Sequence, residues 1–436
     1  AKEELRNVPL VWWNVKQHMG QMNAGLQQYA VMGNVPKDEK GSYAQPVLLN
    51  TNSPWSAFLC GSQGSGKSHA LSCMLEDCLL VDPNIGQNPL PLAGIVFHYD
   101  RSQGSDVCEA AYLCSSVPTK VLVSASNYGR LKGQYEAIAR QCKTTIEVLK
   151  KILRDMAIET GGLGIFNYDV FTGKLDDAGF SDVQNNPLNQ RLDLLETFVD
   201  VKPRDTTAKV EGKLVTKKHV RNPKRSKAKA DMLRREPGTL TIIDLTDPVV
   251  DSDSACALFD ICLSIFISQT TCGKIIALDE AHNYMGGNNA AAANFTERLL
   301  KSIREQRHQG ARVVIATQEP SIDPRLLDLC NVTMVHRCTS PAWFAILKEH
   351  LAALSGKDGV HVFGEIVQLK TGECLLFCPT AAIAIDEKMH GITSMNTGYF
   401  KFRTRKRITA DGGRSKLADD GISGYVDLGK VTSGIL

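Results

Sequence analysis

Short runs of consecutive apolar residues alternate along the chain with segments whose apolar residues recur every three or four positions. The first pattern is typical of strands buried on both faces of a sheet, and the second is typical of amphipathic helices. Together they predict an α/β fold, with a mostly parallel sheet between helices. The runs that predict buried strands are residues 57–60, 93–98, 120–123, 240–245, 275–278, 312–316 and 332–336.

Two local signals predict where helices begin and end. Asn294 followed three residues later by Glu297 resembles a capping box, and it predicts a helix that starts there and stops at Gly310. Ser340 followed by Pro341 predicts the start of a later helix, because serine accepts a hydrogen bond from the first turn and proline suits the first helical position.

The alternation of strands and helices stops between about residues 128 and 238. A helical pattern and then a basic run predict an insertion there, within a sheet domain that spans residues 51–390. Residues 1–50 are predicted to be an N-terminal extension, and residues 391–436 a C-terminal tail. The apolar residues of the helical pattern are Cys142, Ile146, Leu149, Leu153 and Met156.

Charge is concentrated in one part of the insertion. The whole chain has a formal net charge of +3, yet residues 201–235 hold thirteen lysines or arginines against three acids. This segment contains no aromatic residue that could stack on bases. It is compatible with contacts to nucleic-acid phosphates, with a nuclear-import signal or with a solvated loop. The same alternatives apply to a second cluster, Arg403, Arg405, Lys406 and Arg407.

The thirteen cysteines include no CxxC pair. This spacing predicts reduced thiols in an intracellular protein, cytoplasmic or nuclear, and not a disulfide framework or a zinc site. Cys60, Cys73 and Cys262 fall within apolar patterns and are predicted core residues. The longest apolar run, residues 255–268, is interrupted by Asp260 and is too short to cross a bilayer, so no membrane association is expected.

The sequence from Gly61 to Ser68 satisfies the phosphate-loop pattern GxxxxGKS, directly after a predicted strand and before a predicted helix. Glycines let the backbone wrap around phosphates, and the helix presents its positive end to the same anion. Lys67 is expected to reach the β- and γ-phosphates, and Ser68 to hold Mg²⁺. The predicted nucleotide-binding residues are Gly61, Ser62, Gln63, Gly64, Ser65, Gly66, Lys67, Ser68 and His69.

An acidic pair follows the predicted strand 275–278. Asp279 is the expected second magnesium residue, and Glu280 is expected to polarise the attacking water. A later strand ends at Thr317 and Gln318, where a polar side chain could contact the γ-phosphate. These residues predict a Mg²⁺-dependent ATPase.

The motifs together resemble the FtsK/HerA superfamily of P-loop ATPases over roughly residues 50–385, the insertion excluded. The resemblance rests on residues 279–282 (DEAH), an arginine-bearing helix, Thr317-Gln318 followed by Pro320, and residues 369–376. The chain departs from the family in lacking FtsK-like membrane helices and room for a HerA-like N-terminal barrel, and its insertion matches neither.

The resemblance implies roles for single residues. Glu280 would be the general base, and Gln318 would sense the γ-phosphate. An arginine donated across a subunit boundary would stabilise the transition state, with Arg304 and Arg307 as first candidates and Arg337 as a third.

The resemblance also implies a RecA-like fold and a homo-oligomeric, hexameric ring motor that translocates double-stranded DNA. The alternative is a nucleotide-switched assembly or signalling ATPase that does not move DNA. In that case ATP controls oligomerisation, and the helical insertion is the surface for a protein partner.

Overall fold

The structure is a computed structural model of the chain. It describes residues 2–21, 26–36, 44–100, 107–124, 126–149, 236–269, 272–286, 290–319, 322–354, 359–386 and 391–411. The basic segment 201–235, most of the predicted insertion and Pro320 lie outside the described residues.

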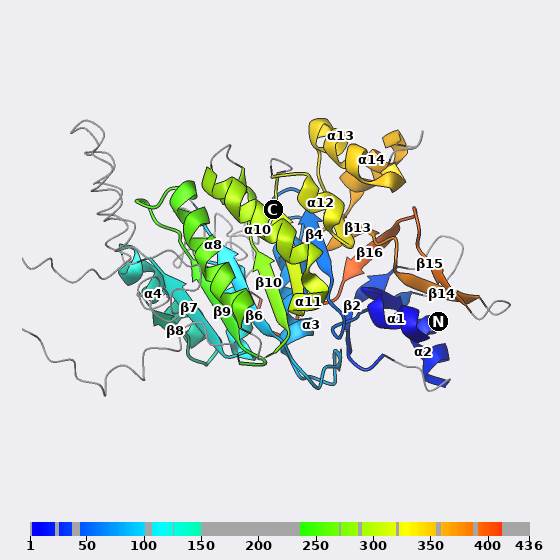
Figure 1. Cartoon of the computed structure of the whole chain (residues 1–436), viewed down its shortest axis with the longest axis horizontal. Coiled ribbons are helices and arrows are strands. Elements are labelled where there is room, and N and C mark those ends of the chain that lie inside the picture. Colours follow the sequence, from blue (N-terminus) through cyan, green and yellow to red (C-terminus); the bar gives the residue numbers. More distant parts are fainter. Residues whose placement is uncertain are drawn as a thin grey trace, which may run out of the picture.

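One sheet runs through the described part of the chain, and eight of its strands form a continuous parallel region (Figure 1). All seven predicted strands are confirmed, with ends that differ by no more than one residue from the prediction. In spatial order the strands are β12 (Val332–His336), β4 (Ser56–Cys60), β11 (Ala311–Thr317), β10 (Lys274–Leu278), β6 (Ala93–His98), β9 (Leu240–Asp244), β7 (Thr119–Val123) and β8 (Glu147–Leu149).

The other strands continue the sheet beyond β12, mostly in antiparallel pairs. They include segments from both ends of the chain, so residues predicted as an extension and as a tail add strands to the same sheet. In spatial order they are β13 (Glu373–Phe377), β16 (Phe400–Thr404), β2 (Tyr29–Val35), β3 (Gln45–Leu49), β1 (Leu10–Trp12), β14 (Ala382–Asp386) and β15 (Gly391–Ser394), with β5 (Gly86–Gln87) paired to β2.

Helices cover both faces of the sheet, as the α/β pattern predicts. Alternate residues of the central strands enter two separate cores: Leu59 belongs to one and Phe58 to the other. The first core includes residues of α1 (Lys2–Asn7), α2 (Trp13–Gln21), α3 (Lys67–Leu79), η1 (Glu109–Ser115) and α4 (Tyr128–Gln141). The second includes residues of α8 (Ser252–Ser268), α9 (His282–Met285), α10 (Ala290–Arg304), α12 (Arg325–Leu329), α13 (Pro341–His350), η3 (Ala352–Leu354) and α14 (Gly359–Gln368). Within the described residues, no helix is both long and apolar enough to cross a bilayer.

The capping box predicted at Asn294 is wrong. Helix α10 already begins at Ala290, because four consecutive alanines favour helix upstream of Asn294. Glu297 is paired with Arg325 instead. The single helix predicted up to Gly310 is interrupted at Glu305: α10 ends at Arg304, and the short helix α11 (Gln306–Gln309) ends at Gly310 with a left-handed φ of 60°. Ser340 caps α13 as predicted, and its side chain accepts a hydrogen bond from the Trp343 amide.

The helix predicted through residues 142–149 is also wrong. Helix α4 ends at Gln141, Lys143 has a positive φ of 54°, and residues 147–149 form β8. The apolar spacing fits either structure over so short a segment, and backbone pairing with β7 decides it. The part of the predicted insertion that precedes residue 150 therefore belongs to the sheet and its covering helices, while the rest of the pattern lies outside the described residues.

Candidate active site

The glycine-rich loop connects the carboxyl end of β4 to the start of α3, as its motif predicts. Three of its glycines have positive φ, at 150° for Gly61, 70° for Gly64 and 106° for Gly66. A Cβ at Gly61 would lie 2.6 Å from the His336 Cβ, and one at Gly66 would lie 2.8 Å from the Gly372 nitrogen. Glycine is required at both positions by conformation and by space.

Two neighbouring strands hold the loop in place. The Ser62 amide donates to the Arg337 carbonyl after β12 at 2.9 Å, and the Gly372 amide before β13 donates to the Ser65 carbonyl at 3.1 Å. The loop is therefore fixed from two sides. Gln63 and Gly64 are exposed at its tip.

Lys67, in the first turn of α3, is only 4% exposed, and its Nζ donates to the Ser62 carbonyl at 3.0 Å. Burial lowers the pKa of Lys67, while the nearby Glu280 and Asp279 carboxylates oppose this shift. Ser68 follows in the same turn and is half-buried. His69 points elsewhere, because its Nε2 lies 2.8 Å from the carbonyl of Arg405.

Asp279, Glu280 and Gln318, the expected sensor of the γ-phosphate, lie together at the same edge of the sheet. Strand β11 lies between β4 and β10, so Gln318 follows the strand beside the acidic one. The Gln318 Nε2 donates to Glu280 Oε1 at 2.8 Å. Glu280 has a positive φ of 48°, a costly conformation for a residue other than glycine and one that is found at functional sites.

Burial and the charge of Asp279 raise the pKa of Glu280, and Lys67 and the Gln318 hydrogen bond act in the opposite direction. A carboxylate that binds a proton more readily than usual is suited to general-base chemistry. The sequence interpretation assigned no role to His282, whose Nδ1 lies 3.5 Å from Glu280 Oε2. Its position two residues after Glu280, in the same motif, could have indicated it.

Asp279 is 4% exposed, and its Oδ1 is buried without a hydrogen-bond partner. An anionic oxygen in this setting fits the demand for a cation, so Asp279 and Ser68 could hold Mg²⁺. Two further residues that the sequence interpretation missed contact the other carboxylate oxygen. His98 Nδ1 lies 3.3 Å from Oδ2, and Cys108 Sγ lies 3.9 Å from it.

The three candidate arginines occupy different edges of the sheet. Arg304 and Arg307 are exposed at the end of α10 and in α11, just before β11 starts, and so lie at the edge opposite the phosphate loop. Arg337 follows β12 and shares the edge with the loop, since its carbonyl accepts from Ser62. Of these three arginines, Arg337 is the one whose backbone contacts the phosphate loop of its own copy.

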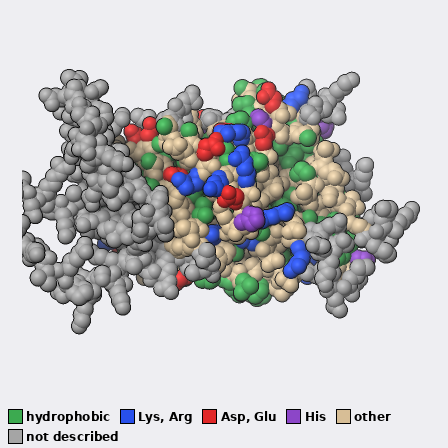
Figure 2. All heavy atoms as spheres, in the orientation of Figure 1, with side chains coloured by type: hydrophobic (Ala, Val, Ile, Leu, Met, Phe, Trp, Pro, Cys, Tyr) green, Lys and Arg blue, Asp and Glu red, His purple; other side chains and the backbone are tan. Residues whose placement is uncertain are grey.

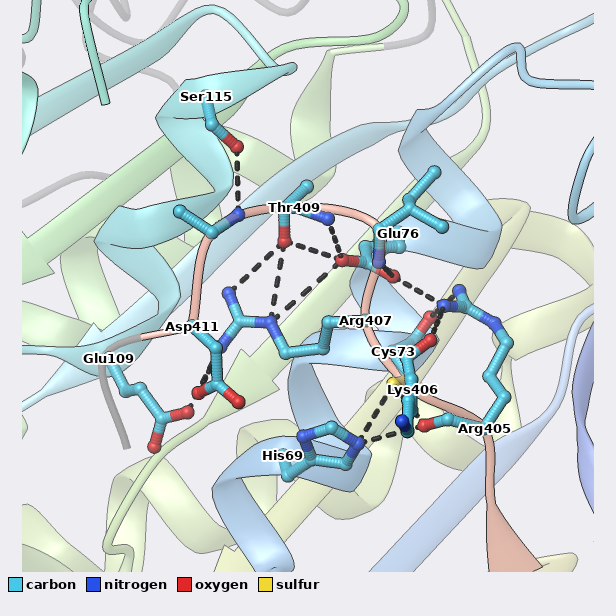
Figure 3. A network of polar contacts seen from close by, with 12 residues as sticks. His69, Cys73, Glu76, Glu109, Ser115, Arg405, Lys406, Arg407, Thr409 and Asp411 are labelled. Carbon is cyan, nitrogen blue, oxygen red and sulfur yellow. Dashed lines mark hydrogen bonds and ion pairs between the residues drawn. The ribbon is translucent and has the colours of Figure 1, made fainter. Parts of the chain in front are cut away.

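A segment near the end of the described chain, residues 405–411, crosses α3 just beyond the phosphate loop (Figure 3). Arg405 donates to Glu76 at 2.6 Å and to Asp77 at 2.7 Å, and both carboxylates are fully buried. Arg407 donates to Glu109 at 3.0 Å. Arg405 and Arg407, two members of the second basic cluster, therefore form ion pairs inside the protein and do not provide a surface for nucleic acid.

The face that carries α8, α10 and α12 shows basic and acidic side chains mixed together (Figure 2). Many of them pair: Arg298 with Asp260, Lys301 with Glu305, and Arg325 with Glu297. No single sign of charge dominates the described part of this face, so nothing in it favours a phosphate backbone.

No family model matches the chain, and no curated protein matches it. Similar solved structures include VirB4 of Thermoanaerobacter pseudethanolicus, at 12% identity and a TM-score of 0.45 over 87% of this chain and 97% of that one. B204, the DNA-packaging ATPase from Sulfolobus Turreted Icosahedral Virus, is 9% identical, with a TM-score of 0.33 over 78% of this chain and 96% of that one.

EssC (ATPases 2 and 3) from Geobacillus thermodenitrificans is 12% identical, with a TM-score of 0.36 over 87% of this chain and 45% of that one. Of these three proteins, B204 and EssC are named as ATPases.

Proposed function

We propose that the chain is a magnesium-dependent ATP hydrolase. The observation that carries this proposal is the hydrogen bond from Gln318 to Glu280, beside Asp279 and within electrostatic range of Lys67. A phosphate loop alone would support triphosphate binding. A buried carboxylate of raised pKa at the same edge adds the base that hydrolysis requires.

Each residue has a distinct role in this proposal. Lys67 exchanges the Ser62 carbonyl for phosphate oxygens, and Ser68 and Asp279 hold Mg²⁺, which neutralises charge on the phosphates. Glu280 orients the attacking water and accepts its proton. Gln318, already bonded to Glu280, is placed to respond when the γ-phosphate leaves.

We further propose that the active form is an oligomeric ring that moves double-stranded DNA. Support comes from the family resemblance of the motifs and from the excess of positive charge in residues 201–235. A ring would also let an arginine of one copy reach the nucleotide of the next, which Arg304 and Arg307 cannot do within their own copy.

An ATPase assay with and without duplex DNA at low salt tests this proposal, together with the mass of the assembly. We expect hydrolysis that needs Mg²⁺, stimulation by DNA, and a multiple of the chain mass. If neither DNA nor RNA binds to the protein, and neither changes the rate of ATP hydrolysis, the proposal of a nucleic-acid motor is refuted.

The second candidate is an assembly ATPase controlled by nucleotide. The observation that favours it is the mixed charge of the described face, which suits a protein partner better than a polyanion. It requires the mass of the assembly to change when a slowly hydrolysed ATP analogue binds. Light scattering with and without that analogue distinguishes it from a ring whose mass does not change.

A further inference from the structure

We propose that His98, Cys108 and Asp279 form a binding site for a thiophilic divalent cation such as Zn²⁺, and that the bound cation weakens magnesium binding at Asp279. His98 ends β6, Cys108 immediately precedes η1, and Asp279 follows β10. The three residues are far apart in sequence, and the edge of the sheet brings them together.

The distances suit a tetrahedral cation. One ligand atom from each residue can be chosen so that all three lie within 4.8 Å of one another. His98 Nδ1 is 3.3 Å and Cys108 Sγ is 3.9 Å from the same oxygen, Asp279 Oδ2. Zinc bonds of about 2.0 Å to oxygen or nitrogen and about 2.3 Å to sulfur place tetrahedral ligands about 3.3 to 3.5 Å apart. The imidazole and carboxylate already match, and the thiol lies slightly farther from Oδ2 than a bound cation would hold it.

The site is closed to solvent. His98 is 5% exposed, Cys108 0% and Asp279 4%. His98 Nδ1, the ring nitrogen that faces Asp279, is buried without a hydrogen-bond partner. Buried polar atoms left in this state are costly, and a cation bound by the imidazole and the carboxylate would remove part of that cost.

The donor set selects the metal. A thiolate, an imidazole and one carboxylate favour Zn²⁺, whereas Mg²⁺ prefers oxygen ligands and retains its waters. Asp244, the register partner of His98 on the neighbouring strand, adds a negative charge near the imidazole, which favours a bound cation. We therefore expect Zn²⁺ to bind more tightly than Mg²⁺ and to release the proton of the Cys108 thiol when it binds.

Occupancy would inhibit hydrolysis, because a divalent cation on Asp279 Oδ2 repels Mg²⁺ at Oδ1 and withdraws electron density from the carboxylate that would hold it. This consequence rests on the proposed ATPase function, but cation binding does not. Cation binding and inhibition of hydrolysis can therefore be refuted separately, each by its own measurement.

The binding measurement uses Co²⁺ with the full chain in metal-free buffer. We expect uptake of one Co²⁺ per chain with an absorption band from thiolate-to-cobalt charge transfer, and removal of the band by Zn²⁺. Cys108→Ser should lose the band. Cys114→Ser is the matched control, a second buried cysteine in η1, and should keep it.

Absence of the band from the wild type, or its persistence in Cys108→Ser, would overturn the proposal. Thermal unfolding without metal checks that Cys108→Ser folds. His98→Gln is a second variant, which keeps the thiol and should lower the affinity for Co²⁺ at least tenfold. Unchanged affinity in His98→Gln would also overturn the proposed ligand set.

The activity measurement follows ATP hydrolysis at a fixed excess of Mg²⁺ while Zn²⁺ is increased. The wild type should be inhibited, and whatever activity Cys108→Ser retains should resist at least tenfold more Zn²⁺. Equal sensitivity of the two proteins would refute inhibition through this site. A cobalt band in a chain that never hydrolyses ATP would leave the cation site standing and refute the proposed function.

Discussion

Glu280 has an unusual setting: its backbone has a positive φ, and its side chain accepts a hydrogen bond from Gln318 and is buried beside Asp279. If it is the base, Glu280→Gln should lower turnover by about 100- to 10,000-fold. ATP affinity should change little, because the amide keeps the shape of the side chain. Steady-state hydrolysis and equilibrium binding of an ATP analogue measure the two effects. Glu349→Gln, at an exposed position of α13, is the control, and undiminished turnover in Glu280→Gln would contradict the assignment.

His336 lies against the phosphate loop, and burial together with Lys67 lowers its pKa to about 3. The unfolded chain takes up this proton near pH 6.5, so the contribution of His336 to stability is present above that pH and is lost as pH falls towards 3. The expected loss is about 1.4 kcal/mol per pH unit.

Urea unfolding between pH 7.5 and 5 tests this expectation. The wild type should lose stability relative to His336→Gln as the pH falls. His308→Gln, at an exposed position, should keep the slope of the wild type. Parallel pH profiles for the wild type and His336→Gln would show that His336 does not stay neutral in the folded chain.

Among the elements, α3 connects the phosphate loop to the C-terminal segment 405–411. Arg405 neutralises Glu76 and Asp77, which are fully buried on this helix. Arg405→Met should therefore lower the free energy of unfolding by about 3–5 kcal/mol, because it removes the charged partner of Asp77 and leaves Glu76 with Arg407 alone. Arg403→Met, an exposed position in β16, should change it by less than about 0.5 kcal/mol. Urea unfolding of the two variants checks this, and similar values for both would contradict the role of the ion pairs.

The elements that were predicted correctly are those with strong local signals. Seven buried strands, the loop from Gly61 to Ser68 and the cap at Ser340 each depend on a short stretch of sequence. Predictions were wrong where other residues outweigh the local signal. The capping box at Asn294 does not start a helix, because the alanines before it already form one. Residues 147–149 pair with β7 instead of continuing a helix. Strands β1 to β3 were missed because their apolar runs, such as residues 10–13 and 47–49, lie within a stretch whose polar, turn-rich composition predicted an extension without strands.

For the whole molecule, the placement of the arginines leads to a test of the ring. Arg304→Ala, Arg307→Ala and Arg337→Ala should be made singly. If one arginine acts across a subunit boundary, its variant alone should be nearly inactive. Mixing that variant with inactive Glu280→Gln should restore hydrolysis, because a mixed boundary joins an intact arginine to an intact base. If hydrolysis recovers with none of the three variants, none of these arginines acts across a subunit boundary. Mass measurement confirms that mixed assemblies form.

The phosphate loop, the acidic pair and the α/β class were predictable from the sequence, because each depends on residue types at fixed local spacing. The surroundings of Asp279 and the position of each arginine relative to the loop became visible only in the folded chain. Contacts among residues 98, 108 and 279 depend on the order of strands in the sheet, and spacing along the chain does not encode that order. For the same reason, cysteine spacing predicted no zinc site, while the fold places a thiol, an imidazole and a carboxylate within reach of one cation.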